Sequence, residues 1–419
     1  MREMKESGIE WVGMIPNTWK VLRNKYNFEL DKRIIGSKCI NTQLLSLTKN
    51  GIKAITEEEQ SGKVPTSFTT YQVVDTDDLV MCLFDLDVSA VFSGISPYSG
   101  MISPAYKCLK CKDHLSPKYI DYYFKTVFVD RKYKRYSKNV RYSLSSDEFM
   151  ALPIIVPPLS EQDLIADYLD SKCIQIDNIS KRIQEEIDTL EDYKKSVITE
   201  AVTRGLDPNV EMKDSGIEYI GEYPSSWSIK RLKYILTERN ERSITGEEEL
   251  LSVSQYKGVI PSKENANRTM QAASLVGYKL VKKNDLVFNK LNPGLARFGW
   301  SGFDGITSPD FAVYMVDKNI CHAKFLQVLL KSSKYVTKIK SLSAGVGDGF
   351  ARLYTPQLYD FSVAVPSNIH ELYEIIRFID ELTSKIDQLI EKKQMQLSTL
   401  EEYKNSLIYE YVTGKKEVA

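Results

Sequence analysis

The sequence predicts a duplicated α+β protein in which two related α/β domains are joined by two long helices that form an antiparallel coiled coil. The first observation is a repeat of the opening segment, because Lys5–Gly13 (KESGIEWVG) returns as Lys213–Gly221 (KDSGIEYIG). A second repeat closes each half, where Thr189–Thr203 matches Thr399–Thr413. Apolar residues seven apart run through the stretches that end in this second repeat. Each half therefore begins and ends alike and differs in its middle, which is typical of one scaffold used twice.

Length and composition agree with more than one domain. The 419 residues exceed what a single hydrophobic core usually covers, and 42% apolar with 11% aromatic residues are ample for burial. The repeats then set the boundaries of four segments. We expect a first domain at 1–157, a first long helix at 158–206, a second domain at 207–366 and a second long helix at 367–415.

The two middle regions are predicted to be mixed sheet and helix, with matching elements. Short strands are expected at 44–48 and 78–81 in the first half, and at 250–254 and 285–288 in the second. Helices follow near 117–129 and 323–340, and a closing strand precedes each long helix at 152–157 and 361–366. The domains are thus expected to be relatives that differ in their loops, where binding residues usually lie.

The two long helices are predicted from heptad spacing. The expected seam positions are Leu169, Ile176, Ile183, Leu190 and Val197 in the first helix, and Ile379, Ile386, Leu400 and Leu407 in the second. Ile179, Tyr193, Leu382, Leu389 and Tyr403 are expected at the alternate positions of the seam. If each helix only capped its own domain, this apolar stripe would stay uncovered. Since the first helix leads from one domain to the other and the second helix leads back, the pair should be antiparallel.

Local breaker residues support these helices and give a length. Pro157 and Pro158 precede a Ser160 cap, and Gly205 followed by Pro208 ends the first helix. The helix should then be roughly 65 Å long at about 1.5 Å per residue. That length matches somewhat under twenty base pairs of duplex DNA at about 3.4 Å per pair.

Charge is balanced over the chain but segregated along it. The chain has 56 basic and 56 acidic residues, yet 121–142 holds seven basic residues against two acidic ones, with tyrosines between them. The segment 331–352 holds five basic residues against one. Lysine and arginine neutralise DNA phosphates, and asparagine pairs with adenine, so both domains are candidates for DNA binding. The candidate DNA-binding residues are Lys125, Arg131, Lys132, Lys134, Arg135, Lys138 and Arg141 in the first domain, and Asn289, Lys290, Asn292, Arg297, Lys331, Lys334, Lys338, Lys340 and Arg352 in the second.

Motifs for catalysis, metal binding and membrane insertion are missing from the sequence. It contains neither the Asn-Pro-Pro-aromatic run of amino-methyltransferases nor a Gly-x-x-x-x-Gly-Lys-Ser/Thr phosphate loop. Cys108 and Cys111 could form half of a zinc site, but no second pair stands at a useful spacing, so two packed thiols are favoured. The opening segment resembles no secretion signal, and no run is apolar for long enough to span a bilayer. We therefore expect a non-catalytic cytoplasmic chain with reduced cysteines, no bound metal and no membrane association.

The combined motifs resemble the specificity subunits of type I restriction-modification systems. They are the SGIEW opening and its mid-chain return, the Pro157–Gln162 start (PPLSEQ) of the first long helix, and the duplicated TLE-x-YK helix end. The resemblance covers the whole chain and implies two target-recognition domains that read the unlike halves of a split DNA site, held apart by the coiled coil. The second helix departs from the pattern, because Pro366–Leu372 reads PSNIHEL where the first has PPLSEQ.

The resemblance also implies partners. Such a subunit joins two modification (methyltransferase) subunits on double-stranded DNA, and restriction subunits with translocase and nuclease activity can be added. The cofactors S-adenosylmethionine, ATP and Mg would bind those partners, and none is expected in this chain. Two alternatives stay open: a specificity subunit of a methylation-only or solitary system, and a duplicated coiled-coil scaffold that binds proteins only. The basic clusters favour DNA recognition over the scaffold.

Overall fold

The computed structural model describes residues 2–48, 51–59, 65–86, 93–137, 142–255, 258–264, 274–291, 293–342 and 352–418. The chain forms two compact units. Unit 1 contains residues 1–184 and 393–419, and unit 2 contains residues 185–392. Both long helices contribute to each unit, because α4 spans Leu159–Arg204 and α8 spans Ile369–Val412.

The globular part of unit 1 alternates short strands with a few helices. Its strands are β1 (Met4–Glu6), β2 (Met14–Pro16), β3 (Lys20–Arg23), β4 (Phe28–Asp31), β5 (Leu44–Thr48), β6 (Gly51–Ile55), β7 (Gln72–Val74), β8 (Leu79–Met81), β9 (Ser93–Ile95), β10 (Gly100–Ile102), β11 (Lys107–Cys111) and β12 (Pro153–Val156). Its helices are α1 (Asn24–Asn27), α2 (Pro117–Val129) and α3 (Ser146–Ala151), with 3-10 turns η1 (Gly36–Asn41) and η2 (Lys132–Tyr136). Two four-stranded sheets, in the orders β6-β5-β10-β7 and β4-β11-β8-β9, form its centre.

Unit 2 repeats the strands of unit 1 in the same order, whereas its helices and 3-10 turns differ in kind or place. Its strands are β13 (Met212–Asp214), β14 (Glu222–Pro224), β15 (Trp227–Arg231), β16 (Leu236–Glu238), β17 (Leu251–Ser254), β18 (Gly258–Pro261), β19 (Lys279–Val281), β20 (Leu286–Asn289), β21 (Phe298–Trp300), β22 (Gly305–Thr307), β23 (Phe311–Val316) and β24 (Ser362–Pro366). Its helices are α5 (Ala323–Lys331), α6 (Ser333–Leu342) and α7 (Thr355–Tyr359), with 3-10 turns η3 (Leu232–Tyr234), η4 (Ser262–Glu264) and η5 (Pro293–Leu295).

Strand pairing repeats between the units, register included. The sheet β16-β23-β20-β21 has the order of β4-β11-β8-β9, and β15 pairs with β24 as β3 pairs with β12. A parallel contact joins Leu44 to Met101 in unit 1, and the same contact joins Leu250 to Ile306 in unit 2. This pairing aligns the two units residue by residue, and it confirms the predicted pair of related α/β domains.

One close approach explains a glycine found at the same place in both sheets. A Cβ atom on Gly100 would lie 2.5 Å from the carbonyl oxygen of Gln43, and a Cβ on Gly305 would lie 2.3 Å from that of Glu249. Backbone therefore meets backbone at these points, and only glycine fits.

The ends of α4 and α8 follow from local sequence. Pro157 and Pro158 precede α4, which begins at Leu159, so the prediction of Ser160 as its cap was wrong. Gly205, with φ of +80°, ends α4 in the left-handed conformation that glycine adopts readily. At the start of α8, the amide of His370 donates to the side chain of Asn368 at 2.9 Å. Asn368 thus caps the helix whose sequence departs from the PPLSEQ pattern.

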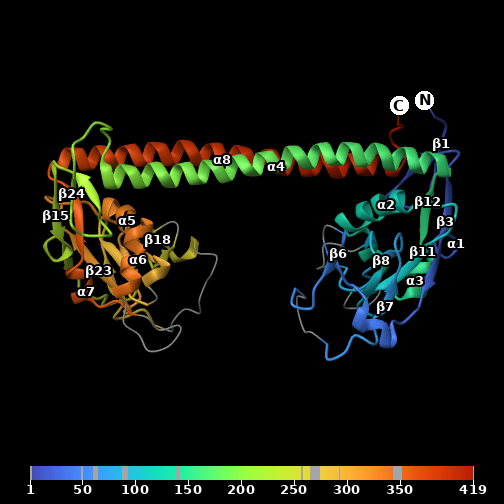
Figure 1. The fold of residues 1–419 in the computed structure, drawn as a ribbon, viewed down its shortest axis with the longest axis horizontal. Coiled ribbons are helices and arrows are strands. Elements are labelled where there is room, and N and C mark those ends of the chain that lie inside the picture. The colour runs from blue at the N-terminus through green and yellow to red at the C-terminus, as the bar shows by residue number, and fades with distance from the viewer. Residues whose placement is uncertain are drawn as a thin grey trace. The chain divides into compact units, whose positions relative to one another are not determined.

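The two long helices are antiparallel within each unit (Figure 1). In unit 1 the Tyr168 ring lies 4.5 Å from the Tyr411 ring, and further along α4 the Asp177 carboxylate binds the Lys404 ammonium at 2.6 Å. In unit 2 Lys194 of α4 binds Asp387 of α8 at 2.6 Å. Residue numbers on α8 fall as those on α4 rise, as expected for an antiparallel coiled coil.

The predicted seam lines differ in burial, and four of the five predicted alternate positions were wrong, whereas Leu382 is partly exposed. Leu169, Ile176, Ile379, Ile386 and Leu407 are buried, whereas Ile183, Leu190, Val197 and Leu400 are partly exposed. However, the alternate positions Ile179, Tyr193, Leu389 and Tyr403 are 46%, 54%, 46% and 56% exposed. The buried partners stand four residues after a seam position instead of three, at Cys173, Ile187, Ala201 and Ile390. The helices are therefore rotated slightly from the predicted face.

In unit 1, α2 lies directly against the long helices (Figure 1). The Tyr119 hydroxyl donates to the carbonyl of Val412 at 2.9 Å, and the Tyr122 hydroxyl donates to Asp170 at 2.7 Å. Both tyrosines belong to the main core of the unit, together with Leu169 of α4 and Leu407 of α8. Within the described residues, no helix is both long and apolar enough to cross a membrane.

A tryptophan–glutamate hydrogen bond ties each domain to the start of a long helix. The Trp19 indole donates to Glu161 of α4 at 3.0 Å, and the Trp227 indole donates to Glu371 of α8 at 2.7 Å. Both indole rings are almost fully buried. Each of these tryptophans stands six residues after the repeated opening segment, so an equivalent residue fixes where a long helix leaves each domain.

Candidate nucleic-acid interface

The basic residues of the first domain lie beside the opening motif and the long helices. Lys132 is held by Asp130 at 2.8 Å, and its ammonium lies 5.0 Å from the Trp11 ring and 5.2 Å from the Tyr409 ring. Lys125 pairs with Asp121 at 2.6 Å. Much of the charge in this cluster is therefore balanced inside the unit.

The rest of that cluster surrounds a shallow hollow next to Trp11. Arg131 and Lys134 line it, with Lys134 placed 4.4 Å from the Tyr142 ring. Arg135 also lines it and pairs with Glu10 at 2.6 Å. Two further candidates, Lys138 and Arg141, lie outside the described residues. Whether this set touches DNA stays a prediction.

In the second domain, α5 and α6 carry four candidates in unlike settings. Lys338 lies 5.9 Å from the Tyr219 ring, as Lys132 lies over Trp11, so both units place a lysine on the aromatic residue of the repeated motif. Lys340 packs beside Gly294, and Lys334 is exposed. Lys331 is recessed, since its ammonium donates to the carbonyl of Gln255 at 2.8 Å and lies 5.7 Å from the Phe298 ring.

The recessed position of Lys331 predicts a dependence of stability on pH. Burial lowers its pKa from 10.5 to about 8. Between pH 8 and 10.5 the folded chain thus binds fewer protons than the unfolded chain, so its stability rises with pH across this window. Relative to a Lys331→Met variant, the wild type should gain on the order of 2 kcal/mol between pH 7 and pH 10 in urea unfolding. The exposed Lys334→Met variant serves as control and should track the wild type. An equal difference at both pH values would contradict this burial effect.

The segment after β20 brings further candidates next to a distant part of the chain. The amide of Leu353 donates to the carbonyl of Lys290 at 3.0 Å, and Leu291 pairs with Arg352 in an antiparallel bridge. Asn289 uses its side chain to accept from the amide of Leu291 at 2.9 Å, while Arg297 is exposed. Asn292 lies outside the described residues. The structure therefore brings the backbones of residues 290–291 and 352–353 together, although Lys290 and Arg352 are 62 positions apart in sequence.

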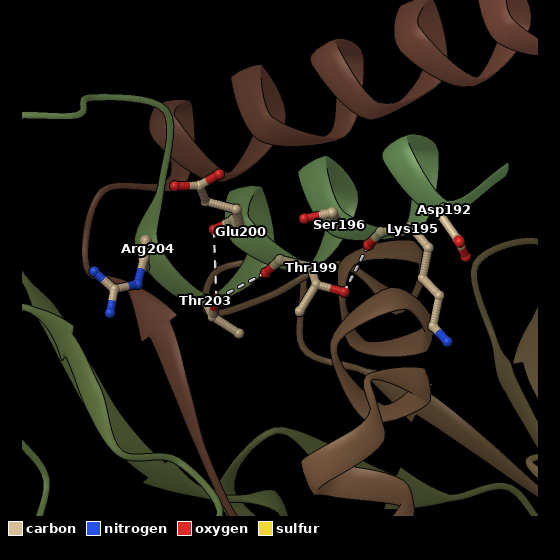
Figure 2. A pocket seen from close by; sticks show the side chains of 7 residues that line it. All are labelled: Asp192, Lys195, Ser196, Thr199, Glu200, Thr203 and Arg204. Carbon is tan, nitrogen blue, oxygen red and sulfur yellow. Dashed lines mark hydrogen bonds between the residues drawn. The ribbon is translucent and has the colours of Figure 1, made fainter. Parts of the chain in front are cut away.

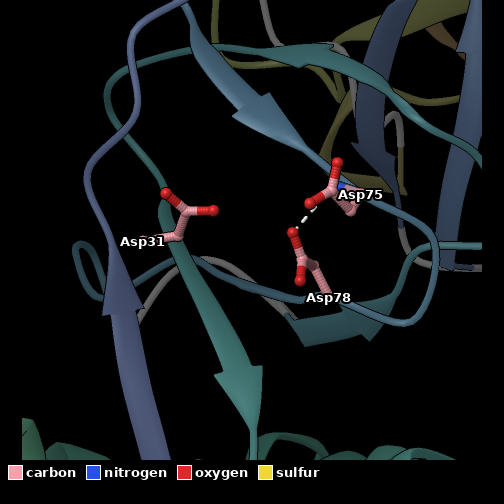
Figure 3. A group of neighbouring side chains, drawn as sticks. All are labelled: Asp31, Asp75 and Asp78. Carbon is pink, nitrogen blue, oxygen red and sulfur yellow. Dashed lines mark hydrogen bonds between the residues drawn. The ribbon is translucent and has the colours of Figure 1, made fainter.

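Three aspartates at the end of the first domain's sheet form an ion-pair network (Figure 3). The Asp75 amide donates to Asp78 at 2.8 Å. Arg33 binds both Asp31 and Asp75, and Lys110 binds Asp75 at 3.0 Å. Hydrogen bonds from Arg33 lower the pKa of Asp31, those from Lys110 and Arg33 lower the pKa of Asp75, and burial raises the pKa of Asp78. Because Arg33 and Lys110 already form ion pairs with carboxylates of this cluster, the cluster is an ion-pair network within the fold.

The second domain carries an arginine in place of one of these aspartates and keeps another. Strand register aligns Asp31 with Arg239 and Asp78 with Asp285. The Arg239 guanidinium donates two hydrogen bonds, of 2.8 and 3.2 Å, to the Asp285 carboxylate. The network of unit 1 is therefore replaced in unit 2 by one bidentate pair. Sequence reasoning missed these residues, although an alignment of the two halves would have revealed the exchanged charges.

A polar hollow of about 450 Å³ lies on the last turns of α4 (Figure 2). The Thr199 hydroxyl donates to the carbonyl of Lys195 at 2.8 Å, and the Thr203 hydroxyl donates to that of Thr199 at 2.7 Å. These hydroxyls are committed to the helix backbone. The charged residues Asp192, Lys195, Glu200 and Arg204 also line the hollow, and Arg204 reaches Glu222 at 3.3 Å.

Two copies of one mixed α/β fold, each tied to a pair of antiparallel helices, define a duplicated architecture with different charged residues on the same strands. Comparison with known protein families gives a match for part of the chain. Residues 24–189 match the family model described as the type I restriction modification DNA specificity domain. The matched part of the chain therefore belongs to this family of DNA specificity domains.

Individual relatives agree with this family. The chain is 23% identical over 291 residues to the type I restriction enzyme MjaVIII specificity subunit of Methanocaldococcus jannaschii. That match covers 64% of this chain and spans 63% of the relative's length.

Two solved structures share the fold. A chain solved for the structural basis of complex assembly and conformational transition of the type I R-M system matches with a TM-score of 0.68 and 11% identity, covering 96% of this chain and 99% of that one. The HsdS subunit from Thermoanaerobacter tengcongensis matches with a TM-score of 0.50 and 11% identity, covering 96% and 98%. At these identities the likeness concerns the fold.

Proposed function

We propose that this chain is the DNA-recognition subunit of a type I restriction-modification complex and that its two domains read the unlike halves of one split target. The proposal rests on a comparison of equivalent positions in the two units. The same sheets, in the same register, present Asp31 and Leu83 in one unit but Arg239 and Lys290 in the other. A shared scaffold whose charged side chains differ between the two units suits two half-sites of different sequence.

Recognition in this proposal serves partner enzymes. The opening motif and the tryptophan–glutamate link to a long helix each occur twice, which would give two like surfaces for two modification subunits. Restriction subunits would join that complex. The chain itself would perform no catalysis and would act in the cytoplasm. S-adenosylmethionine would bind the methyltransferase partners, and ATP and Mg the restriction partners. A scaffold that binds only proteins is disfavoured, because the matched family is a DNA specificity domain.

The long helices would set the distance between the two half-sites. α4 contains 46 residues and α8 contains 44, so each is about 65–70 Å long at about 1.5 Å per residue. The number of unread base pairs should then be constant for this chain.

Methylation mapping tests the proposal. The modification partner is expressed in cells with and without this chain, and methylated bases in the genome are sequenced. We expect methylation at one recurring split sequence only when the chain is present. Methylation of the same sites by the partner alone would contradict a recognition role.

A further inference from the structure

A turn near the start of each domain keeps the same exposed residues in both units, although its buried residues differ. The sequence Arg-x-Lys-Tyr occurs at 23–26, where β3 ends, and again at 231–234, where β15 ends. The arginine, the lysine and the tyrosine are exposed in both turns, with Tyr26 at 55% and Tyr234 at 64%. The buried positions hold unlike residues: Asn24, Asn27 and Phe28 in unit 1, and Leu232, Ile235 and Leu236 in unit 2. Exposed residues usually vary more than buried ones, so the reversed pattern indicates that the exposed face of this turn has a function.

The two turns also share their geometry. A backbone hydrogen bond of 2.8 Å fixes the second residue of each turn, which is Asn24 or Leu232. In both turns the lysine ammonium lies 5.0 Å from the centre of the neighbouring tyrosine ring. One difference is an exposed ion pair of 3.6 Å between Arg231 and Asp360 in unit 2. Each unit thus presents an exposed tyrosine ring from a fixed backbone, with a lysine beside the ring and an arginine in the same turn.

A ligand of these turns has to be common to both units, because the residues that would meet it are identical. Half-sites of different sequence do not offer such a ligand through their bases. DNA phosphates would pair with the arginine and the lysine but gain little from a tyrosine ring, which stacks on unpaired bases that a duplex does not expose. Tyrosine and arginine are enriched where one protein binds another, and their side chains fill pockets of the partner there. The turns therefore fit a protein partner that is bound once by each unit.

We propose that Tyr26 and Tyr234 are the points at which two modification subunits dock, one on each unit. This inference rests on the proposed function and deepens it, because it places the docking surface at a definite turn of each domain. The partner should offer a pocket for a tyrosine ring, rimmed by carboxylates that complement the arginine and the lysine of the turn. Since both turns are alike, each copy of the partner would use the same pocket.

The test measures binding of modification subunits to the full chain by native mass spectrometry over a dilution series. Tyr26→Ala and Tyr234→Ala should each weaken one of the two sites about thirtyfold, and the double variant should weaken both. Tyr26→Phe keeps the ring and should bind as the wild type does. Ile244→Ala is the matched control and should also bind normally, because Ile244 is 88% exposed but stands where unit 1 has Gly36.

Further measurements separate the possible outcomes. Thermal unfolding checks that the variants fold, which we expect because both rings are exposed. Lys25→Glu combined with Lys233→Glu is a second probe, since the reversed charges should repel the partner's carboxylates and slow association. Binding of two modification subunits by the double tyrosine variant with wild-type affinity would overturn the proposal, and weaker DNA binding by that complex would assign the turns to DNA. A wild-type chain that binds no modification subunit would instead contradict the proposed function.

Discussion

Grafting the first reading domain into the second position should convert an asymmetric target into one that contains the same half-site twice. The graft replaces residues 232–361 by residues 24–152. Both segments are joined to the rest of the chain through equivalent strand pairs, β3 with β12 and β15 with β24. The two ends of each segment are joined by a matching backbone hydrogen bond of 2.8 Å. The Asn24 amide donates to the Leu152 carbonyl, and the Leu232 amide donates to the Phe361 carbonyl.

The expected effect of the graft is large. Specific binding commonly exceeds non-specific binding by about a thousandfold or more, so loss of one half-site should remove most of the affinity for the original target. Selection of tightly bound DNA should return two copies of the first half-site. The reciprocal graft should return two copies of the second half-site and serves as the matched control. Selection of the original asymmetric target by both grafts would refute the assignment of one half-site to each domain.

Replacing Arg239 by methionine should destabilise unit 2 by about 3–5 kcal/mol. The reason is that Asp285, whose side chain is 4% exposed, would keep a buried charge without its partner. Asp285 also accepts from the amide of Lys282 at 2.8 Å, a bond that asparagine can preserve. A double variant with Arg239→Met and Asp285→Asn should therefore recover much of the lost stability.

Urea unfolding of the single and double variants measures this coupling. Arg231→Met is a suitable control, because Arg231 and its partner Asp360 are both exposed, and its effect should stay within about 0.5 kcal/mol. If Arg239→Met were as mild as that control, or if the double variant were no better than the single one, the buried pair would not have the role assigned to it.

The repeats made the architecture predictable, but the rotation of the helices was ambiguous. Apolar residues stand both three and four positions after seam residues, as with Leu389 and Ile390 after Ile386. Periodicity alone cannot choose between two such faces, since both give a heptad. In the structure the residue at the fourth position, Ile390, is buried, and the residue at the third position, Leu389, is exposed.

The candidate site was harder to predict than the fold. Counting charges along the sequence favoured Lys132 and its neighbours, yet Lys132 packs on Trp11, which is distant in sequence. Lys279 drew no attention because a single lysine in a strand has no local signal. Its relation to Glu238 and Lys290 arises only when β16, β19 and the end of β20 come together in the folded unit.

Selection from a random DNA library by the chain in complex with its modification partner tests the central claim most directly. Enriched sequences should contain two short blocks of different sequence, separated by a constant number of unread base pairs. A single block, two identical blocks or a variable gap would contradict two unlike readers held on one pair of helices.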